Sequence, residues 1–163
     1  MDDAIDELLE QWRIERPDLD FHPVAVVGRV VRLARVLERE FKEFFAEHGL
    51  EKGEWDVLAV LRRTGEPYAV TAGTLLKAGM LTSGAVTNRI DRMAAKGLVE
   101  RVRDGQDRRE VRVKLTQHGF ELADKLIGLH LENEARLLEA LSDKEMDQLA
   151  DSLRAALRSA ERT

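Results

Sequence analysis

The chain has 163 residues, of which 44% are hydrophobic and 35% charged, a composition typical of a soluble globular protein rich in helix. It contains no cysteine, which excludes disulfides, thiolate metal ligands and thiol redox sensing, and no apolar run approaches the length of a membrane span. The net charge is -5, but residues 71–114 hold ten Lys and Arg against five Asp and Glu, whereas the rest holds sixteen against twenty-six. Positive charge is therefore concentrated in one segment, which favours phosphate contact there.

The N-terminal segment is acidic and predicts a helix rather than a signal peptide, so we expect a cytoplasmic protein. Asp2 or Asp3 can cap this first helix with a side-chain oxygen. Its apolar residues recur at i, i+3, i+4 and i+7, and Trp12 is the last member of the stripe. Pro17 breaks the helix.

A long second helix is predicted from about Pro23 to about His48, because apolar residues keep helical spacing throughout. Gly49 ends this helix as a C-cap residue. A third helix is predicted over about Lys52–Arg63, with its apolar residues turned inward. These helices precede the positively charged segment.

The segment from residue 71 to 115 contains two helical patterns followed by two runs of β-formers. The helices are predicted at Thr71–Ala78 and Thr82–Lys96, and the strands at Leu98–Arg103 and Val111–Leu115, joined by the charged turn Asp104–Arg109. Helix, turn, helix and hairpin in this order are the layout of a winged helix-turn-helix module. Such a module places its second helix in the major groove of DNA and its hairpin tip beside the backbone.

The second of these helices has one apolar and one polar face. Val86, Ile90 and Met93 are spaced by four and three residues and form a stripe that we expect to be buried. Gly84, Asn88 and Asp91 point the opposite way, and Thr87 lies on the flank. Short polar groups on this face can hydrogen-bond base edges. The predicted DNA-binding residues of this helix are Thr82 and Ser83, one of which caps it, with Gly84, Thr87, Asn88 and Arg92.

An ordinary amphipathic helix with a solvated outer face is the simpler interpretation of this pattern. The arginines of the following hairpin favour DNA binding over it.

Two helices follow the hairpin. Thr116 caps the first, which runs to about Ala140, and Ser142 and Glu145 form a capping box for the last, which runs to about Ala160. Their leucines have little core of their own to cover, so we expect a homodimer built from both ends of the chain, whose two-fold symmetry suits a palindromic DNA site. The prediction is one domain over residues 1–163, mainly α with a small β-wing, with dimerisation helices at 1–48 and 117–163 and the winged module at 51–115.

The order of helices around the winged module, and the wing sequence itself, resemble the MarR family of bacterial transcription regulators. The most specific part is an Asp-Arg-Arg tripeptide before a strand that ends in Leu-Thr-x-x-Gly (Asp107, Arg108, Arg109, Leu115, Thr116, Gly119). The resemblance implies a dimer on a pseudo-palindromic operator, with Arg108 or Arg109 in the narrow minor groove and Asp107 orienting it. A solvated hairpin tip is the alternative for these arginines.

A narrower resemblance is to the urate-responsive branch of that family, whose members sense urate with a tryptophan, an aspartate and two arginines. The matching positions here are Trp12, Asp56, Arg89 and Arg101. The resemblance implies that a small aromatic anion such as urate, a related purine or a phenolic acid releases the protein from DNA.

The chemistry of these four residues is consistent with a site for a planar anion. Trp12 offers a flat apolar face. Arg89 lies about 60° from the buried stripe of its helix, so it leans toward the body of the protein and needs an acceptor. Asp56 has only Lys52 as a local partner, which makes Asp56 and Arg89 candidate tertiary partners. Arg101 lies at the start of the wing.

Each of the four also has a simpler interpretation. Trp12 fits a core or dimer-interface residue, Asp56 a surface carboxylate, Arg89 a phosphate clamp and Arg101 an exposed strand residue.

Two other classes of function remain open. A constitutive or architectural DNA-binding protein would need no effector site. An enzyme is disfavoured, because the chain has no glycine-rich phosphate loop after a strand and its four histidines lack metal-ligand spacing. We therefore expect no catalytic residues, no metal and no cofactor.

Overall fold

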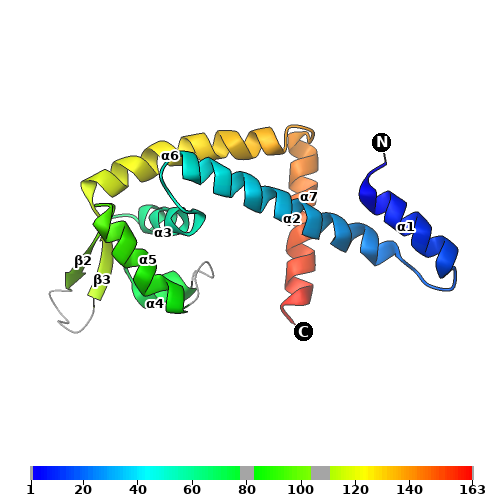
Figure 1. Cartoon of the computed structure of the whole chain (residues 1–163), viewed down its shortest axis with the longest axis horizontal. Coiled ribbons are helices and arrows are strands. Elements are labelled where there is room, and N and C mark those ends of the chain that lie inside the picture. Colours follow the sequence, from blue (N-terminus) through cyan, green and yellow to red (C-terminus); the bar gives the residue numbers. More distant parts are fainter. Residues whose placement is uncertain (1, 78–82, 104–110, 163) are drawn as a thin grey trace. The chain divides into compact units, whose positions relative to one another are not determined.

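The computed structural model describes residues 2–77, 83–103 and 111–162 (Figure 1). The chain divides into two compact units, Met1–Asp56 and Val57–Thr163, and the boundary falls inside helix α3 (Lys52–Arg63). None of the helices in these described ranges combines the length and the apolar character that crossing a membrane requires.

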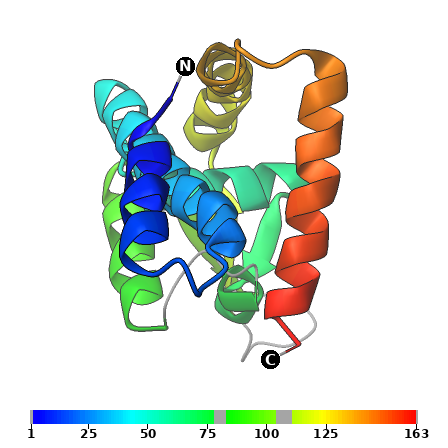
Figure 2. The same ribbon diagram turned by 90° about the vertical axis from the view of Figure 1, so that its right-hand side faces the viewer.

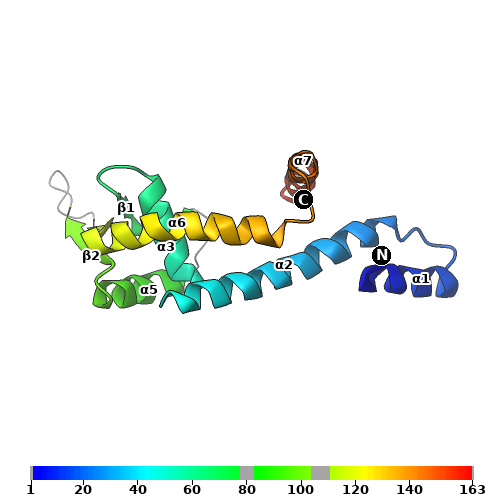
Figure 3. The ribbon, with the colours of Figure 1, turned by 90° about the horizontal axis from the view of Figure 1, so that it is seen from above.

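The first unit contains the helices α1 (Ala4–Glu15) and α2 (His22–Glu47). Asp3 caps α1 and forms a capping box with Asp6, which confirms one of the two caps that the sequence offered. Figures 2 and 3 show α1 folded back beside the N-terminal part of α2, where the two helices contact each other. Gly28 permits this approach, because a Cβ there would lie 3.0 Å from Ile5 Cδ1.

The end of α2 follows the prediction. His48 is its C-cap, and Gly49 has a φ of +72°, in the left-handed region that favours glycine. Phe45, from the last turn, is buried and stacks on Trp55 with ring centroids 5.1 Å apart. This aromatic pair joins the end of α2 to the start of α3 within the first unit.

The second unit contains a three-stranded antiparallel sheet with the order β1–β3–β2. Its strands are β1 (Ala69–Thr71), β2 (Val99–Arg103) and β3 (Val111–Leu115). The two wing strands were predicted, but β1 was not, since Ala69 and Val70 lie between two predicted helices and were assigned to neither. Thr71, predicted as the first helical residue, is the last residue of β1 and pairs with Arg112.

The helix-turn-helix consists of α4 (Ala72–Lys77) and α5 (Ser83–Ala95). Both predicted helices are confirmed, with α4 beginning one residue later than expected. The core of the unit gathers buried side chains from α3, α4, α5, the sheet and the helix that follows it. The largest of them are Leu58, Leu61, Leu75, Met93 and Leu126.

Two C-terminal helices complete the second unit, α6 (Gln117–Leu137) and α7 (Asp143–Ala160). Thr116 caps α6, and Ser142 and Glu145 form the predicted capping box of α7. The predicted end of α6 at about Ala140 is three residues too late, because Leu138 is the C-cap. No residue of α7 is buried, although its leucines recur at helical spacing.

Candidate nucleic-acid interface

Helix α5 turns one face inward and one outward, as predicted. Val86, Ile90 and Met93 are at most 3% exposed. Thr87, Asn88, Asp91 and Arg92 are exposed on the other side. The polar groups proposed to read bases thus lie at the surface of the helix.

Several predicted DNA-binding residues lie at or beyond the edge of the described structure. Ser83 is the first residue of α5 and is therefore already helical, with Gly84 following it. Thr82 and the wing-tip residues Asp107, Arg108 and Arg109 lie outside the described residues. The proposed contacts of the wing tip remain predictions.

The wing strands β2 and β3 carry alternating side chains. Val99 pairs with Leu115 and Arg101 pairs with Val113, so these four residues share one face of the sheet. Val99, Val113 and Leu115 are buried, whereas Arg101 is exposed. On this face of β2, the side chain is therefore apolar and buried at Val99 but charged and exposed at Arg101.

Arg101 is joined to the exposed side of α5. Its Nη1 donates a hydrogen bond to Asp91 Oδ1 at 2.5 Å. The two side chains are 42% and 53% exposed, so this ion pair lies at the surface. It connects the wing strand with the helix proposed to read the major groove.

The four residues predicted to bind an effector are divided between the two units. Trp12 and Asp56 belong to the first unit, and Arg89 and Arg101 to the second. The Trp12 ring stacks on Phe21 with centroids 5.5 Å apart and remains 46% exposed. The tryptophan is therefore not a core residue, and part of its flat surface is open.

Asp56 has the local partner that the sequence offered. Its carboxylate accepts a hydrogen bond from Lys52 Nζ at 3.1 Å, and its side chain is 12% exposed. Because this ion pair connects residues one turn apart on α3, it satisfies the carboxylate without a distant arginine.

Arg89 differs from the other arginines of this region. Its Nε is buried and has no hydrogen-bond partner among the residues that the structure describes. Buried polar atoms are nearly always hydrogen-bonded in folded proteins, so an isolated one indicates a missing acceptor. Arg89 thus has the donor that an anionic ligand would need.

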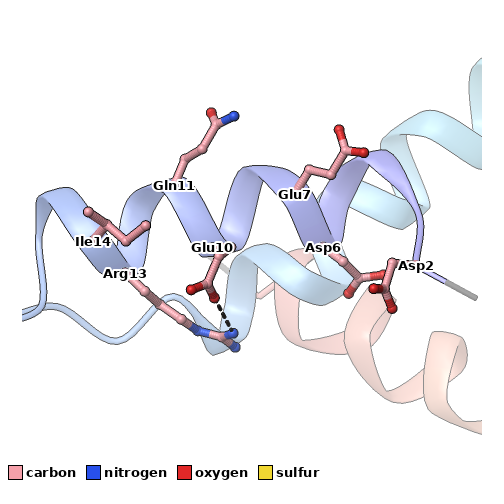
Figure 4. A pocket seen from close by; sticks show the side chains of 7 residues that line it. All are labelled: Asp2, Asp6, Glu7, Glu10, Gln11, Arg13 and Ile14. Carbon is pink, nitrogen blue, oxygen red and sulfur yellow. Dashed lines mark ion pairs between the residues drawn. The ribbon is translucent and has the colours of Figure 1, made fainter.

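An open groove along α1 is mostly acidic and does not suit an anion (Figure 4). Four of the residues that line it are carboxylates, and the ion pair drawn there joins Arg13 to Glu10 at 3.5 Å. Trp12 is not among the lining residues. The groove and the predicted effector residues are therefore different features.

Sequence reasoning placed Asp91 on the outer face of α5 but missed its pairing with Arg101. The partners are ten residues apart and belong to different elements. Their contact depends on which face of β2 meets α5, and the sequence offered only opposite charges as a signal.

Residues 48–110 match the MarR family. The HTH-type transcriptional regulator PecS of Dickeya dadantii strain 3937 is 36% identical over 145 residues, which cover 89% of this chain and 87% of PecS. The chain belongs to the MarR family.

Solved structures agree with this membership. The fold of this chain is similar to that of AbsC, a MarR family transcriptional regulator from Streptomyces coelicolor, with a TM-score of 0.78. The two sequences are 21% identical, and the match covers 89% of this chain and 98% of AbsC. A MarR variant from Escherichia coli, complexed with operator DNA, is 25% identical, with a TM-score of 0.71 over 84% of this chain and 97% of that one. The predicted winged helix-turn-helix fold is thereby confirmed.

Proposed function

We propose that this MarR-family protein is a homodimeric, sequence-specific transcriptional regulator, a repressor that a small aromatic anion such as urate releases from its operator. The proposal that an anion binds is supported by the buried Nε of Arg89, which has no hydrogen-bond acceptor among the described residues. An anionic ligand would supply that acceptor. DNA binding rests on the exposed polar face of α5 and on the relatives named as transcriptional regulators.

Unpartnered apolar surface supports the homodimer. In the second unit, α7 exposes Leu149 and Leu157, which are 39% and 61% exposed. In the first unit, the N-terminal half of α2 exposes a group of aliphatic side chains (Val26, Val27, Val30, Val31, Leu33). Contiguous exposed apolar surface of this kind is typical of a protein interface. Residues 1–48 and 117–163 are accordingly proposed as dimerisation helices, and 51–115 as the DNA-binding module of a single functional domain.

Two-fold symmetry would place two copies of α5 in successive major grooves, about 34 Å apart. Ligand binding near Arg89 would release DNA by rotating α5 or the wing away from that spacing. Such a ligand must bind the two conformations with different affinities, because equal affinity shifts no equilibrium.

Trp12 and Arg101 are proposed to contribute a stacking surface and a second cation, and Asp56 a carboxylate that a bound anion would repel. Trp12 keeps part of its ring surface open, which supports a stacking role. Arg101 and Asp56 already have ion-pair partners, Asp91 and Lys52, so a ligand would compete with or rearrange those pairs.

A band-shift titration tests the proposal. The wild-type protein is bound to an operator duplex selected from random-sequence DNA, and urate, xanthine or a phenolic acid is added to millimolar concentration. Release by one of them is expected. The Arg89→Ala variant should bind the same duplex yet require far more ligand for release, whereas Arg63→Ala, an exposed arginine at the end of α3, should respond as wild type does.

The constitutive alternative makes the opposite prediction. If DNA binding is intact and none of these anions releases the duplex or quenches the tryptophan fluorescence, the effector part of the proposal is wrong and an architectural role is favoured.

A further inference from the structure

We propose that Arg101 is a positioning residue for DNA recognition, which acts through Asp91 by neutralising the only carboxylate among the described residues of α5. The inference rests on the proposed DNA-binding function and adds to it a role for Arg101 in the effector-free protein. It requires no contact between Arg101 and DNA.

The position of Arg101 on the sheet brings it to α5. Val99, two residues earlier on the same face, is buried, and α5 packs against β2. Since side chains on one face of a strand recur every second residue, Arg101 is the first residue of this face beyond the hydrophobic core. Its side chain can therefore reach the edge of α5 while its backbone stays in the ladder with Val113.

Asp91 lies where its negative charge would affect DNA binding. It lies four residues after Thr87 and three after Asn88, so the three side chains occupy neighbouring places on the exposed face of α5. This is the face that the proposed function turns toward DNA. An unpaired carboxylate there would repel the phosphates, and Arg101 cancels that charge at a distance of 2.5 Å.

Folding stability gives little reason for this pair. Both side chains are about half exposed, and ion pairs between exposed side chains stabilise a fold only slightly. Charges at an interface mainly steer a charged partner during association and fix its orientation. The Asp91–Arg101 ion pair is thus better explained by a role in binding a charged partner at α5 than by a role in folding stability.

A double-mutant cycle in the full-length protein tests this role, with no effector present. Arg101→Ala, Asp91→Asn and the double variant are compared with wild type for affinity to the selected operator duplex and to an unrelated duplex of equal length. Arg103→Ala is the matched control, because Arg103 lies two residues further on the same face of β2 and is also exposed.

Arg101→Ala should weaken operator binding about tenfold, the size of coupling typical of one ion pair. Adding Asp91→Asn should recover most of that loss, since no repelling carboxylate then remains. Asp91→Asn should not recover the smaller loss expected for Arg103→Ala. Both duplexes should lose affinity alike in Arg101→Ala and regain it in the double variant, because repulsion of phosphates does not depend on the DNA sequence.

Equal losses from Arg101→Ala with and without Asp91→Asn would overturn the proposal, because Arg101 would then contact phosphate directly. If Arg101→Ala lowers the melting temperature, the exchange of the two charges, Asp91→Arg with Arg101→Asp, provides the same comparison: binding better than that of Arg101→Asp alone is expected, and binding no better overturns the proposal. Failure of the wild-type protein to bind any duplex would instead contradict the proposed function.

Discussion

Gly119 lies so close to Leu98 that a Cβ on the glycine would be 1.9 Å from the Leu98 carbonyl oxygen and 2.9 Å from its carbon. The contact joins the first turn of α6 to the residue before β2. Thr116 closes the same junction: its hydroxyl donates to the Gly97 carbonyl oxygen at 2.6 Å and accepts from the Gly119 N–H at 3.0 Å. The start of α6 is thus held against the turn that follows α5.

Gly119→Ala should therefore destabilise the protein. In a helix this change normally favours folding by up to about 1 kcal/mol, but here the backbone of Leu98 must move. We expect a loss of about 2 kcal/mol or more in the free energy of unfolding, measured by urea denaturation. Gly128→Ala is the control, because it lies in the same helix with no atom within 4 Å of an added Cβ. It should leave stability unchanged or raise it, and equal effects of the two variants would contradict the close contact.

Arg29 holds α1 to α2 through two carboxylates, and this clamp should weaken in acid. The guanidinium donates to Asp6 at 2.7 Å and to Asp3 at 2.9 Å. The Arg29 hydrogen bond lowers the pKa of Asp6 below its ordinary value of 3.8. Desolvation raises the pKa of Asp3, but hydrogen bonds from the backbone N–H groups of Ile5 and Asp6 and from Arg29 lower it by more.

Carboxylates with lowered pKa values favour folding above the ordinary value and lose that contribution as pH falls through the lowered one. The difference in melting temperature between wild type and Arg29→Ala should therefore be constant above about pH 5 and shrink below about pH 4. Arg32→Ala removes an exposed arginine of the same helix and should show no such dependence. A difference that grows in acid would refute the clamp.

Leu157→Glu tests whether α7 lies in an interface between subunits. Leu157 is 61% exposed in the single chain, so a charge there costs the monomer little. In a dimer the carboxylate would be buried without a partner, and the dissociation constant should rise about a hundredfold or more. Ala155→Glu places the same charge on the opposite side of α7 and should leave the dimer intact. Sedimentation equilibrium that shows the same mass for both variants would exclude α7 from the interface.

Urate should raise the melting temperature of the wild-type protein, because a ligand that binds only the folded state stabilises it. At a concentration of about 100 times the dissociation constant, the stabilisation is about 2.7 kcal/mol. Trp12→Ala and Arg89→Ala should remove most of this shift. Arg92→Ala, an exposed arginine on the outer side of α5, should keep it. A full shift in the Arg89→Ala variant would exclude that arginine from the ligand site.

The helices were predictable because their ends are encoded locally. Asp3, Gly49 and Thr116, and the capping box of Ser142, act within a few residues of the chain, and each marked a helix end correctly. The buried stripe of α5 followed from periodicity alone. Strand β1 was not predicted, because three residues are too few to show the alternation of apolar and polar side chains that marks a strand. Its hydrogen bonds depend on β3, which is distant in the sequence.

The candidate site was less predictable because it depends on contacts between elements. Helical periodicity predicted the exposed positions of Thr87 and Asn88. It could not predict the link from Asp91 to Arg101, which follows from the packing of β2 on α5. Asp56 was predicted as a candidate tertiary partner of Arg89, with Lys52 as its only local partner, and the ion pair that Asp56 forms is the local one. Local charge spacing thus predicted better than tertiary charge pairing.

Because the strand order is β1–β3–β2, the sheet of this module can form only after β3 has been synthesised. The central strand is the last of the three to be made, so β1 and β2 leave the ribosome with unpaired edges and must wait for Val111–Leu115. Unpaired edges of nascent chains are prone to wrong association. A chain truncated before Val111 would therefore hold α5 without the complete sheet beside it, and we expect it not to bind an operator.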